Sequence, residues 1–102
     1  MDGEIVVLFS AKLRPDADAA AYEALSARMA ELVVSIPGFV GVREYDMPEG
    51  EEFAIVRFAS QEALSEWRNH PEHREAQRRG REDFYESYRI EITESRRAAI
   101  FP

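Results

Sequence analysis

The 102-residue sequence is 45% hydrophobic and 11% aromatic, a composition that supports one domain with its own core and excludes a disordered tail. The formal net charge of −7 at pH 7 argues against a nucleic-acid-binding protein, which would need a basic surface to neutralise phosphates. Because the sequence has no cysteine, disulfides, thiolate metal sites and cysteine nucleophiles are excluded.

The beginning of the sequence is acidic and has no basic segment before its first apolar run, residues 5–9. That run is too short for a signal-peptide core or a membrane span. We therefore expect a cytoplasmic protein with no membrane partner, folded as a single domain over residues 1–102. Its core is expected at about residues 4–94, and its C-terminal tail, 95–102, is apolar enough to dock on another surface.

Residues 4–13 are predicted to form the first strand, because β-branched and aromatic residues dominate this segment. Its central residues, 5–9, are apolar at consecutive positions rather than at alternating ones. Since the side chains of a strand point alternately to its two faces, both faces of this strand must be buried.

A helix is predicted over residues 19–36, since its apolar side chains recur at spacings of three and four. Either Asp16 or Asp18 is expected to cap it, because a carboxylate can accept hydrogen bonds from the open amides of the first turn. Pro37 and Gly38 should end the helix.

The second and third strands are predicted at residues 39–46 and 52–59. A short turn at 47–51, which contains a proline and a glycine, joins them, so they should be antiparallel neighbours. The third strand again carries apolar side chains on both faces, and Arg57 lies on one of these faces. Arg57 must therefore be either at an opening or paired.

The next helix should start after Ser60, a good N-cap, and end near residue 69 or 70. Pro71 ends it there because a proline disfavours the helical conformation at His70 and removes an amide. Since proline suits the first position of a helix, a second helical segment is predicted from Pro71 to Arg79, ended by Gly80.

A group of arginines lies between residues 68 and 81, where an anion site would be one interpretation. Acidic residues are interleaved with these arginines, and Glu75 precedes Arg79 by four residues, the favourable order for a helical ion pair. We therefore expect a solvated charged surface. The arginines are Arg68, Arg74, Arg78, Arg79 and Arg81.

Residues 84–94 alternate in polarity and predict a fourth strand, so the element order is β-α-β-β-α-β. This order indicates an α+β, ferredoxin-like fold in which a four-stranded antiparallel sheet carries both helices on one face. The first and third strands would then leave an apolar patch on the opposite face, larger than a monomer normally exposes. We expect a second copy to cover it with two-fold symmetry, sheet against sheet, which makes a homodimer.

The sequence resembles the antibiotic biosynthesis monooxygenase family of dimeric α+β barrels. The resemblance rests on the element order and on four sequence features: Gly38-Phe39 at the opening of the second strand, the segment 53–58 (FAIVRF), the segment 67–76 (WRNHPEHREA), and the later aromatic residues Phe84, Tyr85 and Tyr88. The resemblance covers about residues 4–93. It implies a cavity between the sheet and the helices of each subunit, near the helix that carries Trp67.

Relatives in this family include cofactor-free oxygenases that act on polycyclic phenols, haem-degrading enzymes and other small-molecule converters. The haem degraders use an asparagine on the first strand, a helix tryptophan and a later histidine that binds iron. Trp67 matches the tryptophan, but the histidine position falls near Gln77 and the first strand has no asparagine. The resemblance therefore implies no cofactor and disfavours haem, although His70 or His73 could supply an axial nitrogen.

Cofactor-free oxygenation needs an apolar cavity, a base that forms a phenolate, and donors that hold the resulting anion. We expect His73 to be the base, with His70 as the second choice, and Arg57 or Arg43 to hold the anionic oxygen. A small apolar or aromatic ligand would lie against side chains that we expect to line the cavity: Trp67, Phe9, Phe58, Tyr85 and Tyr88.

Each of these residues also has a purely structural interpretation. Trp67 could be core, His70 could cap the second helical segment, and His73 could bond a backbone carbonyl. No metal site is expected, because the two histidines adjoin a helix break and no carboxylate clearly converges on them. The first alternative function is a non-catalytic or stress-related protein that binds a small ligand in the same cavity; the second is a haem-binding relative.

Overall fold

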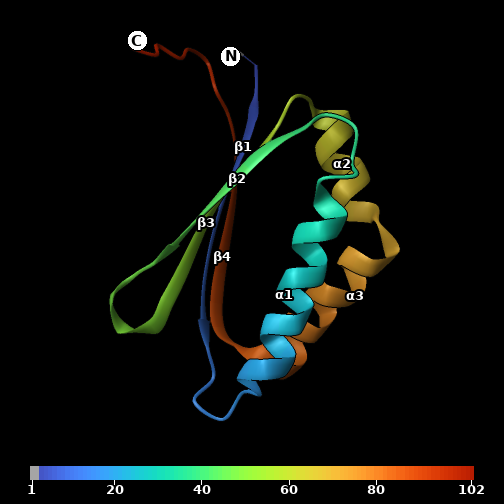
Figure 1. Cartoon of the computed structure of the whole chain (residues 1–102), viewed down its shortest axis with the longest axis vertical. Coiled ribbons are helices and arrows are strands. Elements are labelled where there is room, and N and C mark those ends of the chain that lie inside the picture. The colour runs from blue at the N-terminus through green and yellow to red at the C-terminus, as the bar shows by residue number, and fades with distance from the viewer. Residues whose placement is uncertain (1–2) are drawn as a thin grey trace.

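The computed structural model describes residues 3–102, so the first two residues of the predicted domain lie outside it. Four antiparallel strands form one sheet in the order β2-β3-β1-β4, and the helices cover one of its faces (Figure 1). This arrangement confirms the predicted ferredoxin-like fold. The strands are β1 (Ile5–Leu13), β2 (Phe39–Asp46), β3 (Glu51–Phe58) and β4 (Tyr85–Glu94).

The first helix, α1 (Ala19–Val33), is capped by Asp18, whose carboxylate accepts from the amide of Ala21 at 3.0 Å. The helix ends three residues before the predicted end at residue 36. There the amides of Ser35 and Ile36 bond carbonyls only three positions back, in the tighter turns that close many helices. Ile36 is nevertheless buried, so the turn still contributes its apolar side chain to the core.

The second helix, α2 (Gln61–Asn69), is capped by Ser60, whose hydroxyl accepts from the amide of Ala63 at 3.2 Å. His70 has an extended backbone, and α3 (Pro71–Arg79) starts directly after it, as the proline predicts. Among residues 3–102, no helix is both long and apolar enough to span a membrane.

Gly80 does not stop the chain in a left-handed turn, because its backbone stays right-handed helical (φ −55°, ψ −50°). The helix continues for one wider turn, η2 (Gly80–Phe84), which was not predicted and which moves the start of β4 from Phe84 to Tyr85. A Cβ atom on Gly80 would lie 2.4 Å from Cε2 of Tyr85. A glycine is needed here because the ring of Tyr85 lies directly against the backbone of residue 80.

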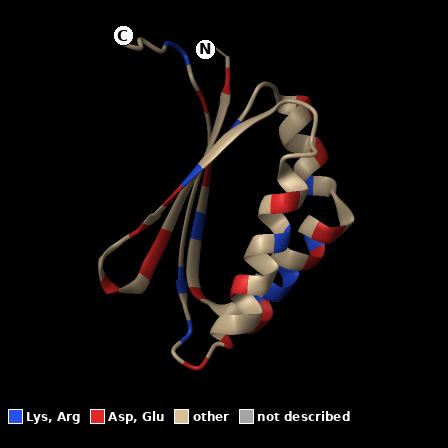
Figure 2. Ribbon diagram, in the orientation of Figure 1, with Lys and Arg blue, Asp and Glu red and all other residues tan. Residues whose placement is uncertain are grey.

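Two arginines of α3 are paired with acidic side chains, and Figure 2 shows acidic and basic residues interleaved along this part of the chain. Arg78 pairs with Glu75 and Glu82, and Arg79 lies 3.8 Å from Asp83. These are exposed pairs, which contribute little to stability individually. They confirm the predicted charged surface, although Glu75 pairs with Arg78 rather than with Arg79.

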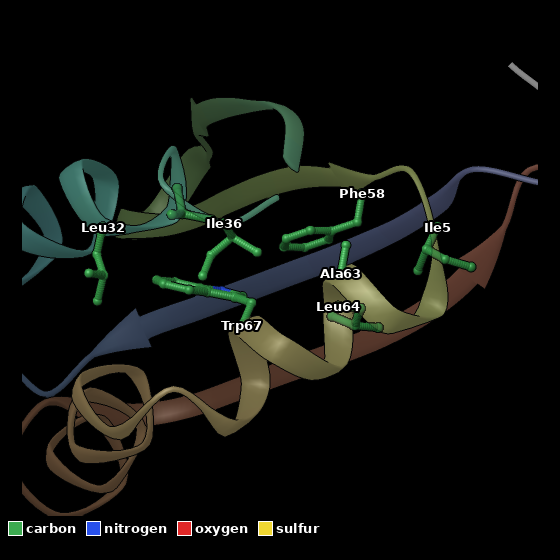
Figure 3. Packing of buried hydrophobic residues seen from close by; sticks show 8 residues of the cluster. Ile5, Leu32, Ile36, Phe58, Ala63, Leu64 and Trp67 are labelled. Carbon is green, nitrogen blue, oxygen red and sulfur yellow. The ribbon is translucent and has the colours of Figure 1, made fainter. Parts of the chain in front are cut away.

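The filled core lies where α2 and the end of α1 meet the sheet (Figure 3). Phe58 and Ile5 are 0% and 1% exposed, and the indole of Trp67 packs among the same side chains. The cluster comprises Ile5, Leu32, Val33, Ile36, Phe58, Ala63, Leu64 and Trp67.

The register of the strands confirms that β1 and β3 are apolar on both faces. Val7 pairs with Val56, and both face the helices; Leu8 pairs with Ile55, and both face the opposite side. Since no helix within residues 3–102 covers that second face, this side of the sheet is uncovered in the described part of the single chain (Figure 1). We call this side, which carries Leu8 and Ile55, the open face.

Candidate functional site: a cavity between sheet and helices

A cavity of about 660 Å³ lies between the helix-facing side of the sheet and the helices α1 and α3. This is a typical volume for a small-molecule site. All of the side chains predicted to contact a ligand line it, although they come from three strands and one helix. They are Phe9, Phe58, Trp67, Tyr85 and Tyr88.

Trp67 and His73 form a stacked pair on the helical wall of this cavity. Their ring centroids are 4.0 Å apart and the ring planes differ by 18°. Nδ1 of His73 lies 3.0 Å from the backbone carbonyl oxygen of Trp67. Because a carbonyl can only accept, Nδ1 carries the proton, and the lone pair of the neutral ring is on Nε2.

Burial lowers the pKa of His73 from 6.5 to about 4, against a smaller opposing contribution from the Trp67 carbonyl. The ring is therefore neutral at pH 7 and able to accept a proton. It is also a weak base, because full proton transfer from a simple phenol of pKa about 10 would cost about 8 kcal/mol.

His70 and Arg57 do not line the cavity. Nδ1 of His70 accepts from the amide of Glu72 at 3.2 Å, so this ring caps α3. Arg57 lies on the open face, where its Nη1 is 3.1 Å from Oε1 of Glu4. The sheet separates Arg57 from the helical wall of the cavity, and Arg43 is on the same open face, opposite Ile55. Neither arginine can hold an anion in this cavity within one chain.

A hydrogen-bonded group at the other end of the cavity was not predicted. The hydroxyl of Tyr22 on α1 donates to Oε2 of Glu52 on β3 at 2.6 Å, and the ring of Tyr22 contacts the ring of Tyr85 edge-on. All three residues line the cavity. Burial raises the pKa of both tyrosines, so both hydroxyls keep their protons at neutral pH.

The sequence did contain a signal for these residues. Glu52 alternates in register with Ala54 and Val56, so strand parity places it on the helix-facing side of β3. Tyr22 belongs to the apolar stripe of α1, which faces the sheet. What the sequence did not show is that α1 stands far enough from the sheet to leave a cavity rather than filled core.

Within residues 3–102, no group of three or more histidine, aspartate or glutamate side chains converges in a way that could hold a metal ion. Gln77, which occupies the position of the haem-binding histidine in the resemblance, lines the cavity. An amide side chain is not one of the usual axial ligands of haem iron.

A four-stranded ferredoxin-like sheet with helices on one face and a cavity beneath them defines the structural class of this protein, a small α+β domain. Within that class, the sequence profile of the antibiotic biosynthesis monooxygenase family matches residues 4–79. The chain belongs to this family. The match includes α2, Trp67 and α3, which form the helical wall of the cavity.

This chain is similar to other proteins both in sequence and in structure. The uncharacterized protein YqjZ of Bacillus subtilis (strain 168) is 32% identical over 80 residues, which cover 78% of this chain and 70% of YqjZ. SnoaB of Streptomyces nogalater, a cofactor-independent oxygenase, superposes with a TM-score of 0.76 at 15% identity, covering 94% of this chain and 96% of SnoaB. Rv0793 of Mycobacterium tuberculosis gives 0.77 at 22% identity, with 97% of each chain covered. At these identities the two structures establish the shared fold alone.

Proposed function

We propose that this protein is a cofactor-independent monooxygenase that oxidises a phenolic or quinol-type substrate in the cavity beside Trp67. Family membership and the cofactor-independent oxygenase among the structural neighbours support this reaction class. The observation that carries the proposal is the stacked pair of Trp67 and His73, which places a neutral imidazole on the wall of an aromatic cavity.

In this mechanism the ring of the substrate packs against Trp67, and its hydroxyl donates to Nε2 of His73. Transfer of that proton leaves an electron-rich phenolate, which is the species that reacts with molecular oxygen. One oxygen atom becomes a new carbonyl on the substrate, and the other leaves as water with two substrate hydrogens. The substrate supplies all four electrons that reduce the oxygen molecule, so no further reductant is required.

The low basicity of His73 limits the substrate to acidic hydroxyls, such as phenols conjugated to a carbonyl. Once the phenolate forms, its negative charge next to the ring raises the pKa of the imidazolium and assists the transfer. Since neither Arg57 nor Arg43 reaches the cavity, the anion is stabilised by His73 itself and by the polar side chains of the wall.

Oxygen uptake with a panel of phenols and quinols tests the reaction. His73→Phe keeps a ring that can stack on Trp67 but removes the nitrogen, and we expect it to lower kcat about 10²- to 10⁴-fold, the usual contribution of a general base. His70→Asn is the matched control and should leave uptake unchanged, because His70 does not line the cavity. Undiminished uptake in His73→Phe would rule out the assigned base.

The alternatives give different outcomes in the same experiments. A non-catalytic binding protein would bind the phenols without consuming oxygen. A haem-binding relative would shift the Soret band when titrated with micromolar haem; we expect no shift, because Gln77 replaces the histidine ligand of the resemblance. The cytoplasmic location stays a prediction.

The assembly that we propose is a homodimer formed through the open face. The apolar side chains there are Val6, Leu8, Phe53 and Ile55, which are only partly buried in the single chain. A second copy related by two-fold symmetry would cover them. Light scattering should give the dimer mass, and Leu8→Glu should give a folded monomer or no stable protein. A monomeric wild type would contradict the two-faced pattern of β1 and β3.

A further inference from the structure

We propose that the end of the cavity formed by Glu52, Tyr22 and Tyr85 is a subsite that accepts hydrogen bonds from a hydroxyl or ammonium group of the ligand. This inference deepens the proposed function and rests on the cavity being the ligand site. It assigns a polar recognition role to residues that lie at the opposite end from His73, and it predicts which substituent a substrate carries there.

The direction of the hydrogen bonds sets the chemistry of the subsite. The single hydroxyl proton of Tyr22 is donated to Glu52 Oε2 at 2.6 Å, so it is not available to a ligand. Among residues 3–102, Tyr22 is the only donor to the Glu52 side chain. What this pair leaves for a ligand is an acceptor, the second carboxylate oxygen of Glu52.

The tyrosine rings are held by neighbouring aromatic side chains, so the hydroxyl of Tyr22 holds the Glu52 carboxylate from a fixed position. Tyr22 contacts the rings of Phe84 and Tyr85 edge-on, with centroids 5.4 and 5.9 Å away. Phe9 lies 5.8 Å from Tyr85 on the other side. A preorganised carboxylate of this kind favours a ligand group that can donate, because little side-chain freedom is lost on binding.

The charges along the cavity point to the same class of ligand group. Besides Glu52, the lining contains Glu23, Glu44 and Asp46, against the two arginines Arg68 and Arg81. The carboxylates of β2 and β3 are close to one another, since Asp46 pairs with Glu52 and Glu44 with Ala54. A carboxylate or phosphate on the ligand would be repelled at this end, whereas a hydroxyl or a protonated amine would be attracted.

The separation of the two ends constrains the length of the ligand. Val56 packs against the core cluster that contains Trp67, and Glu52 is four residues away on the same strand. At a rise of about 3.3 Å per residue, the two positions are about 13 Å apart. A ligand that contacts both Trp67 and Glu52 is therefore an elongated, fused-ring molecule with a donor group at the end far from His73.

Isothermal titration calorimetry with three matched probes tests the subsite: naphthalene carrying a hydroxyl, an aminomethyl or a carboxylate group at position 2. Wild-type protein should bind the hydroxyl and aminomethyl probes at least about tenfold more tightly than the carboxylate probe. In Glu52→Gln the aminomethyl probe should lose most affinity, the hydroxyl probe a few-fold, and the carboxylate probe should gain.

Tyr22→Phe is the second variant, in case Glu52→Gln disturbs folding, and thermal melting checks both. This change removes the donor to Glu52 Oε2, so the unpaired carboxylate should bind the aminomethyl probe more tightly and discriminate more strongly against the carboxylate probe. Glu62→Gln removes the same charge from the exposed first turn of α2, outside the cavity, and should change no affinity.

The outcomes separate the subsite from the proposed reaction. Equal affinities for the three probes, or unchanged discrimination in both variants, would overturn the subsite while leaving the cavity as a ligand site. Absence of binding by every probe to the wild type would overturn the subsite and the proposed function together. Discrimination that follows the expected pattern without oxygen uptake by any phenol would support the subsite and count against the reaction.

Discussion

The space between the sheet and the helices has two ends that are built from the same layers but packed differently. At the end near α2, Ile5 is 1% exposed and packs in a cluster of buried apolar side chains (Figure 3). Toward the start of α1, Ile90 also faces the helices but remains 44% exposed, because it borders a cavity. One pair of layers therefore provides both a stabilising core and an open site.

Polar contacts account for part of this difference. Tyr22 reaches from α1 to Glu52 on β3 through its hydroxyl, and Arg28 binds both oxygens of Glu72 at 2.8 Å to join α1 to α3. At the other end, α2 meets the sheet through small and branched side chains such as Ala63. A helix held by long polar side chains can stand away from a sheet, whereas one held by apolar contacts must lie against it.

The largest effect is expected from a matched pair of isoleucine substitutions, one at each end. Ile5→Ala should lower the free energy of unfolding by about 2–5 kcal/mol, because it leaves a cavity in filled core. Ile90→Ala should cost about 1 kcal/mol or less, since its side chain already borders empty space. Urea unfolding measures both, and equal losses would contradict the distinction between the ends.

The next largest effect is the pH dependence of the free energy of unfolding, which we expect to come from His73, the residue that stacks on Trp67. The pKa of His73 is about 4 in the folded state and about 6.5 when unfolded, so between these values the unfolded chain binds the extra proton. Stability should therefore fall as the pH drops from 6.5 to 4, by up to about 3 kcal/mol. Urea unfolding across this range should show a flatter profile for His73→Phe than for the wild type. Parallel profiles would mean that His73 is not buried as a neutral ring.

A smaller effect is expected where η2 meets the cavity. Gly80→Ala should lower stability by about 1–3 kcal/mol, because the new methyl group would displace the ring of Tyr85. Gly41→Ala provides the control, since no atom lies within 4 Å of the position of its Cβ. Thermal melting distinguishes the two. If both glycines tolerate alanine equally, Tyr85 is not fixed in the position that the subsite requires.

The smallest effect is expected from substitutions of His70, which caps α3, in contrast to His73, which lines the cavity. His70→Ala should cost about 0.5–1 kcal/mol through loss of the α3 cap, and His70→Asn should recover most of it, because asparagine is among the best N-caps. Neither change should affect oxygen uptake or probe binding. A catalytic defect in His70→Asn would show that this ring acts in the site as well as in the cap.

Much of the fold was predictable because it depends on local rules. Pro71 and Ser60 marked the helix boundaries, and the alternation of side chains along β1 and β3 showed that both faces are apolar. Of the site, the same alternation brought Phe9 and Phe58 to the cavity wall. The same alternation argues against the predicted anion-holding role of Arg57. Adjacent residues of a strand point to opposite faces, so Arg57 lies on the open face when Phe58 faces the cavity.

The sequence by itself determined which side chains share a face, since periods of two and 3.6 residues follow from backbone geometry. Only the tertiary structure decided how far those faces stand apart. That distance depends on contacts between residues remote in sequence, such as Tyr22 with Glu52, and on a glycine that admits the Tyr85 ring. The pKa of His73 was decided in the same way, because burial against Trp67 depends on how the two helices fold back over the sheet.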